Sequence, residues 1–246
     1  MALTDEMNKQ GVWLFRWRSY LPLVLLLLFP ASLAGLHWPF GSYEFHEAWE
    51  FCCLMLSLLG LAVRCTTVGF VPAGTSGRNT SDQVAEELNT TGLYSVVRHP
   101  LYLGNYLIGL GVALVWLNWW VPVVYTLFFW LYYERIMVAE ERYLEGKYGD
   151  RFRRWAVATP AFVPRFSQWR RPSLPFSART VLKREYTGLM VVVLLHSAIE
   201  VAEHIWMDGR PKFGPDWTIT LIAATAVYLT LRALKKHTHL LEVPGR

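Results

Sequence analysis

Two short segments of the chain carry side chains that could do chemistry together. The first holds Arg98, His99 and Tyr102. The second holds the adjacent pair Glu140 and Glu141. Together they offer a cation, an imidazole, a phenol and two carboxylates. Histidine and glutamate are frequent proton donors and acceptors in enzymes, and a guanidinium binds carboxylate and phosphate groups. The set is therefore typical of a site that binds a charged molecule and positions it for reaction.

The first segment lies where the sequence changes from polar to apolar. A segment rich in Gly, Ser and Thr precedes it, and the run 107–124 that follows has no charged residue. Pro100 suits the first turn of a helix, because the first N–H groups of a helix have no intrahelical partner. Those N–H groups and Arg98 form a natural receptor for a carboxylate or phosphate. We therefore predict that this segment lies at the mouth of a transmembrane helix.

A predicted helical hairpin brings the two segments together. Its arms are the apolar stretches 101–117 and 121–138, and the short connection between them, Asn118-Trp119-Trp120, leaves room only for a tight turn. Each arm rises about 1.5 Å per residue, so the two open ends of the hairpin lie at the same depth. The first segment should therefore face the second at one membrane interface. This arrangement suits a reaction between a water-soluble cofactor and a membrane-embedded substrate.

Composition places the chain among integral membrane proteins. Of its 246 residues, 53% are hydrophobic and 17% are charged, and several apolar runs approach the length that crosses a bilayer. The net charge of +5 does not indicate nucleic-acid binding, because the basic residues cluster beside apolar runs, as membrane topology predicts. No Cys-x-x-Cys occurs among the three cysteines, so we predict neither a disulfide framework nor a cysteine zinc site.

The expected fold is all-α, with six transmembrane helices and both termini in the cytoplasm. Lys and Arg residues flank the termini and fill the segments 64–98 and 139–187, and positive residues favour the cytoplasmic side. We expect the inner membrane of a bacterium. Two surface helices are predicted over 81–88 and 140–156. The predicted spans are 20–38, 48–63, 101–117, 121–138, 188–207 and 217–234.

A second polar set occurs inside the fifth predicted span. His196, Glu200, Glu203 and His204 share one helical face, because they are spaced by four, seven and eight residues. Ionisable groups within a span are functional by default, and His and Glu are possible metal ligands. A buried polar face that pairs with another span, or that lines a substrate portal, is nevertheless the more common arrangement. We therefore predict no metal site here.

The catalytic segments resemble the motifs of a known family. The residues 98–104, Arg-His-Pro-Leu-Tyr-Leu-Gly, reproduce the Arg-His-Pro-x-Tyr-x-Gly motif of the isoprenylcysteine carboxyl methyltransferase and phospholipid methyltransferase group. The second motif of that group resembles, in the same order, Glu140-Glu141, Tyr143-Leu144, Tyr148-Gly149, Phe152 and the stretch from Pro160 to Pro164. The resemblance covers residues 60–166. It implies a methyltransferase core over 64–166. The apolar runs predict a two-span region over 1–63 before this core, and a basic linker with two further spans over 167–246 after it.

The resemblance implies methyl transfer from S-adenosylmethionine at the cytoplasmic membrane face, to a membrane lipid or a lipidated substrate. Arg98, His99, Glu140 and Glu141 would be the catalytic residues, and the two glutamates would bind the ammonium or ribose of the cofactor. A methyl group on a sulfonium is already activated, so the protein would mainly supply proximity and alignment. The cofactor pocket would be formed by Tyr94, His99, Pro100, Tyr102, Leu103, Gly104 and Glu140.

The sequence does not identify the methyl acceptor. A phospholipid amine, a lipid phosphate or a prenylcysteine-like carboxylate would each fit. An anionic oxygen needs no base, whereas an amine must lose a proton, which Glu141 or His99 could take. The basic segment 142–184 mildly favours an anionic headgroup.

Two other classes of function are alternatives to methyl transfer. A sterol-reductase-like, nicotinamide-dependent membrane oxidoreductase would resemble this group in the same region, but the chain has only six predicted spans. A non-catalytic membrane partner protein is the other alternative, and the intact motif argues against it.

Overall fold

The computed structural model describes residues 2–18, 20–21, 24–25, 28–33, 42–72, 74–75 and 86–246. Within these ranges the regular secondary structure is helical, without a β-strand, so the predicted all-α class is confirmed. Two single 3₁₀ turns cover Leu93–Ser95 and Phe166–Gln168. The α-helices are α1 (Leu3–Trp17), α2 (Leu28–Leu33), α3 (Tyr43–Gly69), α4 (Pro100–Leu114), α5 (Trp120–Tyr148), α6 (Asp150–Ala158), α7 (Ala178–Asp208) and α8 (Pro215–His237).

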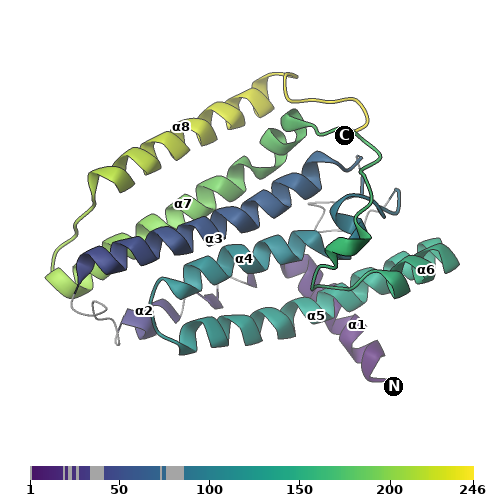
Figure 1. Cartoon of the computed structure of the whole chain (residues 1–246), viewed down its shortest axis with the longest axis horizontal. Coiled ribbons are helices and arrows are strands. Elements are labelled where there is room, and N and C mark those ends of the chain that lie inside the picture. Colours follow the sequence, from purple (N-terminus) through teal and green to yellow (C-terminus); the bar gives the residue numbers. More distant parts are fainter. Residues whose placement is uncertain are drawn as a thin grey trace.

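The long helices lie side by side, with α3 in the middle. In Figure 1, α4 lies along one side of α3 and α7 along the other, α8 lies beyond α7, and α5 beyond α4. Glycines allow the close contact between α3 and α4. A Cβ atom on Gly60 would lie 2.5 Å from the backbone oxygen of Gly104, and one on Gly104 would lie 2.7 Å from the oxygen of Gly60. Such small-residue contacts are typical of packed membrane helices, and this one fixes the helix that carries the first motif.

Three of the described helices are long and apolar enough to cross a membrane: α3, α7 and α8. Helix α4 is apolar but has only 15 residues. The first predicted span, 20–38, falls largely outside the described residues, as does the surface helix predicted over 81–88. The last three residues of that surface helix, 86–88, are described and are not helical. The count of six spans therefore stays a prediction.

The structure corrects three element boundaries. No separate surface helix begins at Glu140, because α5 continues without a break to Tyr148 and α6 starts only at Asp150. The residues after position 138 are mostly good helix formers, and the helix ends at Gly149, whose φ of 51° favours glycine. Helix α7 begins at Ala178 instead of residue 188, because the Ser177 side chain accepts a hydrogen bond from the Thr180 N–H and caps it.

The third correction concerns the N-terminus. Residues 1–18 precede the first predicted span and no helix is predicted there, but α1 occupies most of them and packs against α5. A Cβ atom on Gly11 would overlap the backbone oxygen of Arg135, so the two helices are in close contact. On the outside of this contact, Arg142 Nη1 lies 2.7 Å from Asp5 Oδ1. Helix α1 is therefore brought close to the second catalytic segment.

Candidate active site

Aromatic side chains hold the two arms of the hairpin, α4 and α5, against each other. The Tyr125 hydroxyl donates to the backbone oxygen of Tyr106 at 3.0 Å. Ring centroids are 5.0 Å apart for Tyr106 and Phe129, 4.2 Å for Phe129 and Tyr133, and 4.7 Å for Tyr133 and Tyr102. This chain of contacting rings runs along the interface to the catalytic end, so the relative depth of the two arms is fixed by packing.

The hairpin brings the two catalytic segments into direct contact, as the sequence predicts. His99 Nε2 lies 2.9 Å from Glu141 Oε1, and the Nε of Arg98 donates to the same oxygen at 2.8 Å. The hydroxyl of Tyr102 donates to Glu140 Oε1 at 2.6 Å. His99 Nδ1 lies 3.6 Å from Glu140 Oε2. The imidazole thus lies between two carboxylates.

The chain that follows α6 closes over the first motif. Backbone N–H groups of Arg98 and His99 donate to the carbonyl oxygens of Pro160 and Ala161, at 2.9 and 3.2 Å. The Arg98 Nη1 donates to the carbonyl oxygens of Ala156 and Thr159, at 2.6 and 2.7 Å. Arg98 is therefore held on one side by backbone and on the other by a carboxylate. This geometry suits a residue that positions Glu141.

The pKa values of His99 and Glu141 move in opposite directions. Burial lowers the pKa of His99, but hydrogen bonds and charge interactions with Glu140 and Glu141 outweigh burial, and the net shift is upward. Burial raises the pKa of Glu141, but its contacts with His99 and Arg98 outweigh burial, and the net shift is downward. Both shifts therefore favour the ionised form of the side chain over what a free side chain would show. Both shifts make it harder for these groups to take a proton from a substrate.

Glu140 combines a fixed position with access to solvent. Its side chain is 25% exposed, whereas that of His99 is 6% exposed. Helix α1 brings a further cation to it, because Arg18 Nη1 lies 3.9 Å from Glu140 Oε1. Sequence reasoning missed Arg18, whose position depends on the packing of α1 on α5. The basic residues that precede the first apolar run were the available signal.

The remaining residues predicted for the cofactor pocket occupy varied positions. Pro100 is buried in the first turn of α4, and Gly104 faces α3. The side chains of Tyr94 and Leu103 are half-buried, and the backbone oxygen of Tyr94 accepts a hydrogen bond from the Trp155 indole at 3.0 Å. Gly104 has a clear packing role. The cofactor roles of these residues stay predictions.

An apolar hollow of about 640 Å³ lies between α1 and α5. Its apolar lining is aromatic and aliphatic, and Lys9, Gln10 and Arg135 add polar groups to it. Cations beside an apolar surface suit the head and chain of an anionic lipid. The apolar residues that line the hollow are Trp13, Leu14, Phe128, Leu131 and Tyr132.

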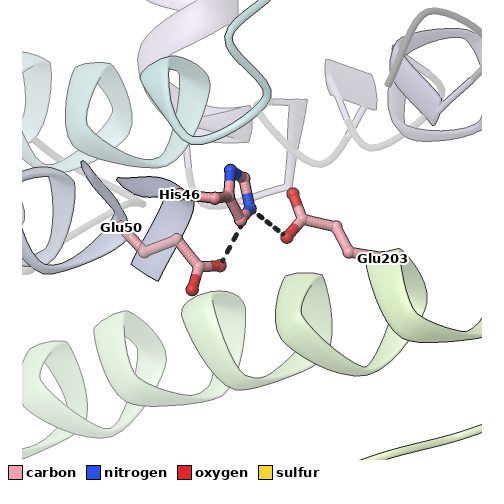
Figure 2. Close-up of side chains that lie close together, drawn as sticks. All are labelled: His46, Glu50 and Glu203. Carbon is pink, nitrogen blue, oxygen red and sulfur yellow. Dashed lines mark hydrogen bonds and ion pairs between the residues drawn. The ribbon is translucent and has the colours of Figure 1, made fainter. Parts of the chain in front are cut away.

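The four polar residues predicted on one face of α7, His196, Glu200, Glu203 and His204, make separate contacts in the structure. His196 turns to α3, with its Nε2 3.1 Å from the Ser57 hydroxyl. Glu203 instead meets His46, also from α3, with 2.8 Å between Oε2 and Nε2, and Glu50 Oε1 lies 3.8 Å from the same nitrogen (Figure 2). All three residues are buried. Sequence reasoning missed His46 and Glu50, although their spacing of four residues within an apolar helix was a usable signal.

Glu200 and His204, the other two members, lie beside this cluster. Their side chains meet each other at 3.3 Å and both approach the hydroxyl of Tyr43, at 3.5 and 3.4 Å. His204 Nδ1 also lies 2.9 Å from Asp208 Oδ2. Within the described residues, the predicted face of α7 therefore meets the start of α3, the helix on which His46 and Glu50 lie.

Comparison with known proteins gives one family and three relatives. Residues 51–151 match the phospholipid methyltransferase family. A nickel-cobalt-cadmium resistance protein from Alcaligenes xylosoxydans xylosoxydans is 29% identical over 76% of this chain and 83% of its own length. A cobalt-zinc-cadmium resistance protein from Cupriavidus metallidurans is 35% identical over 63% of this chain and 64% of its own length.

The third relative is a protein-S-isoprenylcysteine O-methyltransferase from Schizosaccharomyces pombe. It is 28% identical over 60% of this chain and 59% of its own length. The chain thus spans less than two thirds of the second and third relatives. No solved structure gives a significant match. The family match covers both catalytic segments.

Proposed function

We propose that this chain, a membrane methyltransferase that resembles the isoprenylcysteine carboxyl methyltransferase and phospholipid methyltransferase group, transfers a methyl group from S-adenosylmethionine to an anionic oxygen. The family match and the yeast relative support methyl transfer. The observation that carries the finer proposal is the closed contact of His99, Arg98 and Glu141 beside the accessible Glu140. The acceptor would be a membrane lipid or a lipidated substrate.

The residues at the hairpin end fit such a cofactor. Glu140 offers a partly exposed carboxylate whose position is fixed by the Tyr102 hydroxyl, and it would hold the cofactor's ammonium group. The first turn of α4, which starts at Pro100, is partly positive and would favour the cofactor's carboxylate. When bound, S-adenosylmethionine supplies a methyl group already activated by its sulfonium.

The protein's own contribution would be alignment. Glu141 is held by Arg98 and His99, and Arg98 is held in turn by the backbone carbonyls of Ala156 and Thr159. None of these contacts needs to form when the substrate arrives. Pre-positioned groups of this kind lower the barrier by removing the entropy cost of orientation.

The charges at the site favour an acceptor that carries no proton. The raised pKa of His99 favours its protonated form, and the lowered pKa of Glu141 makes its carboxylate a weaker base, so both shifts disfavour removal of a proton from the substrate. An amine acceptor would need one, whereas a carboxylate or phosphate oxygen would not. The name of the yeast relative also states O-methyl transfer. We therefore place phosphate and carboxylate acceptors ahead of amines.

The proposal places the site at the cytoplasmic face of a bacterial inner membrane, with both termini in the cytoplasm. The distribution of Lys and Arg supports this orientation. The region 64–166 would be the catalytic core, since it contains both catalytic segments. The apolar hollow between α1 and α5 would admit the lipid part of the acceptor.

We expect purified protein to bind S-adenosylmethionine at one site per chain and not to bind a reduced nicotinamide dinucleotide. Isothermal calorimetry with each cofactor separates the methyltransferase from the oxidoreductase alternative. Glu140→Gln should weaken binding, because it removes the charge that faces the cofactor's ammonium group. Glu145→Gln, one turn further along α5 and paired with Arg153 on the surface, is the matched control. Binding of the nicotinamide cofactor alone would reverse the assignment.

A further inference from the structure

We propose that His46, Glu50 and Glu203, which meet where α3 and α7 are in contact, form a binding site for a divalent transition-metal ion. The inference is independent of the methyl transfer proposed above. It revises the sequence-based prediction of no metal, which considered α7 alone. Figure 2 shows the two glutamates approaching one ring nitrogen of His46 from different helices.

The distances between the possible ligand atoms fit a small ion. His46 Nε2 lies 2.8 Å from Glu203 Oε2 and 3.8 Å from Glu50 Oε1. One ligand atom from each of the three residues lies within 4.8 Å of the others. Zinc bonds of about 2.0–2.2 Å in tetrahedral geometry place neighbouring ligand atoms about 3.3–3.6 Å apart. The observed distances lie on both sides of that value, so small rotations of the side chains would complete the site.

The charge of this region also calls for a cation. Glu50, Glu200 and Glu203 are 3%, 3% and 1% exposed, and within the described residues no Lys or Arg lies at ion-pair distance from any of them. The other deeply buried glutamate, Glu185, makes a bidentate pair with Arg64. Buried carboxylates are costly unless a cation or a proton neutralises them, and a bound metal ion would serve all three. Glu203 Oε1 is moreover buried with no hydrogen-bond partner in the described structure, so it is available to a ligand.

The ligand types indicate the class of metal. One imidazole and two carboxylates match the nitrogen and oxygen ligands of Zn²⁺ and Co²⁺. Calcium and magnesium prefer sites made of oxygen atoms, and copper(I) prefers sulfur ligands. The neighbouring contacts of Tyr43, Glu200 and His204 would restrain the cluster and add negative charge beside it.

The proposed ion would lie far from the methyl-transfer site. His46 and Arg64 both lie on α3, 18 residues apart in number, which corresponds to about 27 Å along the helix. Arg64 contacts Asn105 near the start of α4, so it marks the catalytic end of the bundle. An ion at the His46 end would hold α3 to α7 at the opposite end.

The test uses the full chain purified in detergent, treated with a chelator, reloaded with Zn²⁺ or Co²⁺ and passed through a desalting column. We expect one equivalent of either metal per chain by elemental analysis, a visible Co²⁺ spectrum, and a higher melting temperature with metal present. Wild-type protein that retains no stoichiometric metal, or only an excess removed by desalting, would overturn the proposal without the need for any variant.

Conservative variants then test which residues bind. Glu50→Gln and Glu203→Gln keep side-chain size and should each lose the retained metal and its thermal shift, as should His46→Gln. His196→Gln is the matched control, because His196 is an equally buried histidine on α7 that bonds to Ser57 instead. It should retain one equivalent. If Glu50→Gln and Glu203→Gln both still hold one equivalent of metal, the assigned ligands are wrong. The same conclusion follows if His196→Gln loses the metal while Glu50→Gln and Glu203→Gln retain it.

Discussion

His99→Ala and Glu141→Ala should each lower methyl transfer by about 100-fold or more, while the protein stays folded in the membrane. His99 Nε2 and Glu141 Oε1 are 2.9 Å apart, and together they fix the catalytic face of the hairpin. Displacing groups that align reactants by about 1 Å can cost about 100-fold in rate. His99 lies just before the start of α4, and the Glu141 side chain is 26% exposed and polar, so truncation removes little apolar burial and should cost little stability.

The measurement is the rate of label transfer from methyl-labelled S-adenosylmethionine per folded molecule. Tyr102→Phe should be milder, because it keeps the ring and loses one hydrogen bond, worth about 1 kcal/mol. Glu145→Ala, on the exposed side of α5, should leave the rate unchanged. Wild-type rates in both the His99 and Glu141 variants would mean that the reaction takes place elsewhere.

Arg64→Met should destabilise the protein by about 3–5 kcal/mol, because it leaves Glu185 buried without its partner. The Nε of Arg64 donates to Glu185 Oε2 at 2.8 Å and its Nη2 donates to Oε1 at 3.0 Å. A third bond, from Nη1 to Asn105 Oδ1 at 2.6 Å, ties α4 to the same cation. The Arg64 side chain thus links three helices, α3, α4 and α7.

Equilibrium unfolding in detergent, with a double-mutant cycle, measures this contribution. The double variant Arg64→Met with Glu185→Met should be less destabilised than Arg64→Met alone, since it buries no lone charge. Arg153→Met removes a surface partner of Glu145 and should cost no more than about 1 kcal/mol. Equal decreases in the free energy of unfolding for Arg64→Met and Arg153→Met would show that the buried pair contributes no more to stability than the surface pair.

Local sequence information was enough to predict the hairpin and what it brings together. The apolar arms and the short turn between them set the relative depth of their ends, so the contact of His99 with Glu141 could be predicted without a structure. The same reasoning failed for element ends within polar sequence. Nothing in the charged stretch after residue 138 marks where the second arm of the hairpin stops, and the break occurs only at Gly149, where φ is positive.

Partners from distant parts of the chain were not predictable in the same way. Hydrophobic periodicity shows which face of a helix is buried but not which helix covers it. The approach of Arg18 to Glu140 depends on how α1 packs on α5, and the contact of His46 with Glu203 depends on which helix lies beside α7. In both cases one partner was singled out from the sequence, and the structure supplied the other.

Methyl transfer to an anionic oxygen can be measured by incubating the purified chain in lipid vesicles with methyl-labelled S-adenosylmethionine and identifying the labelled product. The vesicles would contain phosphatidic acid, phosphatidylethanolamine and a farnesylcysteine, which offer a phosphate, an amine and a carboxylate. We predict O-methyl label on the phosphate or the carboxylate, with a rate lower by about 100-fold or more in the Glu141→Ala variant. No transfer to any of the three by the wild-type chain, or label confined to the amine, would contradict methyl transfer to an anionic oxygen at this site.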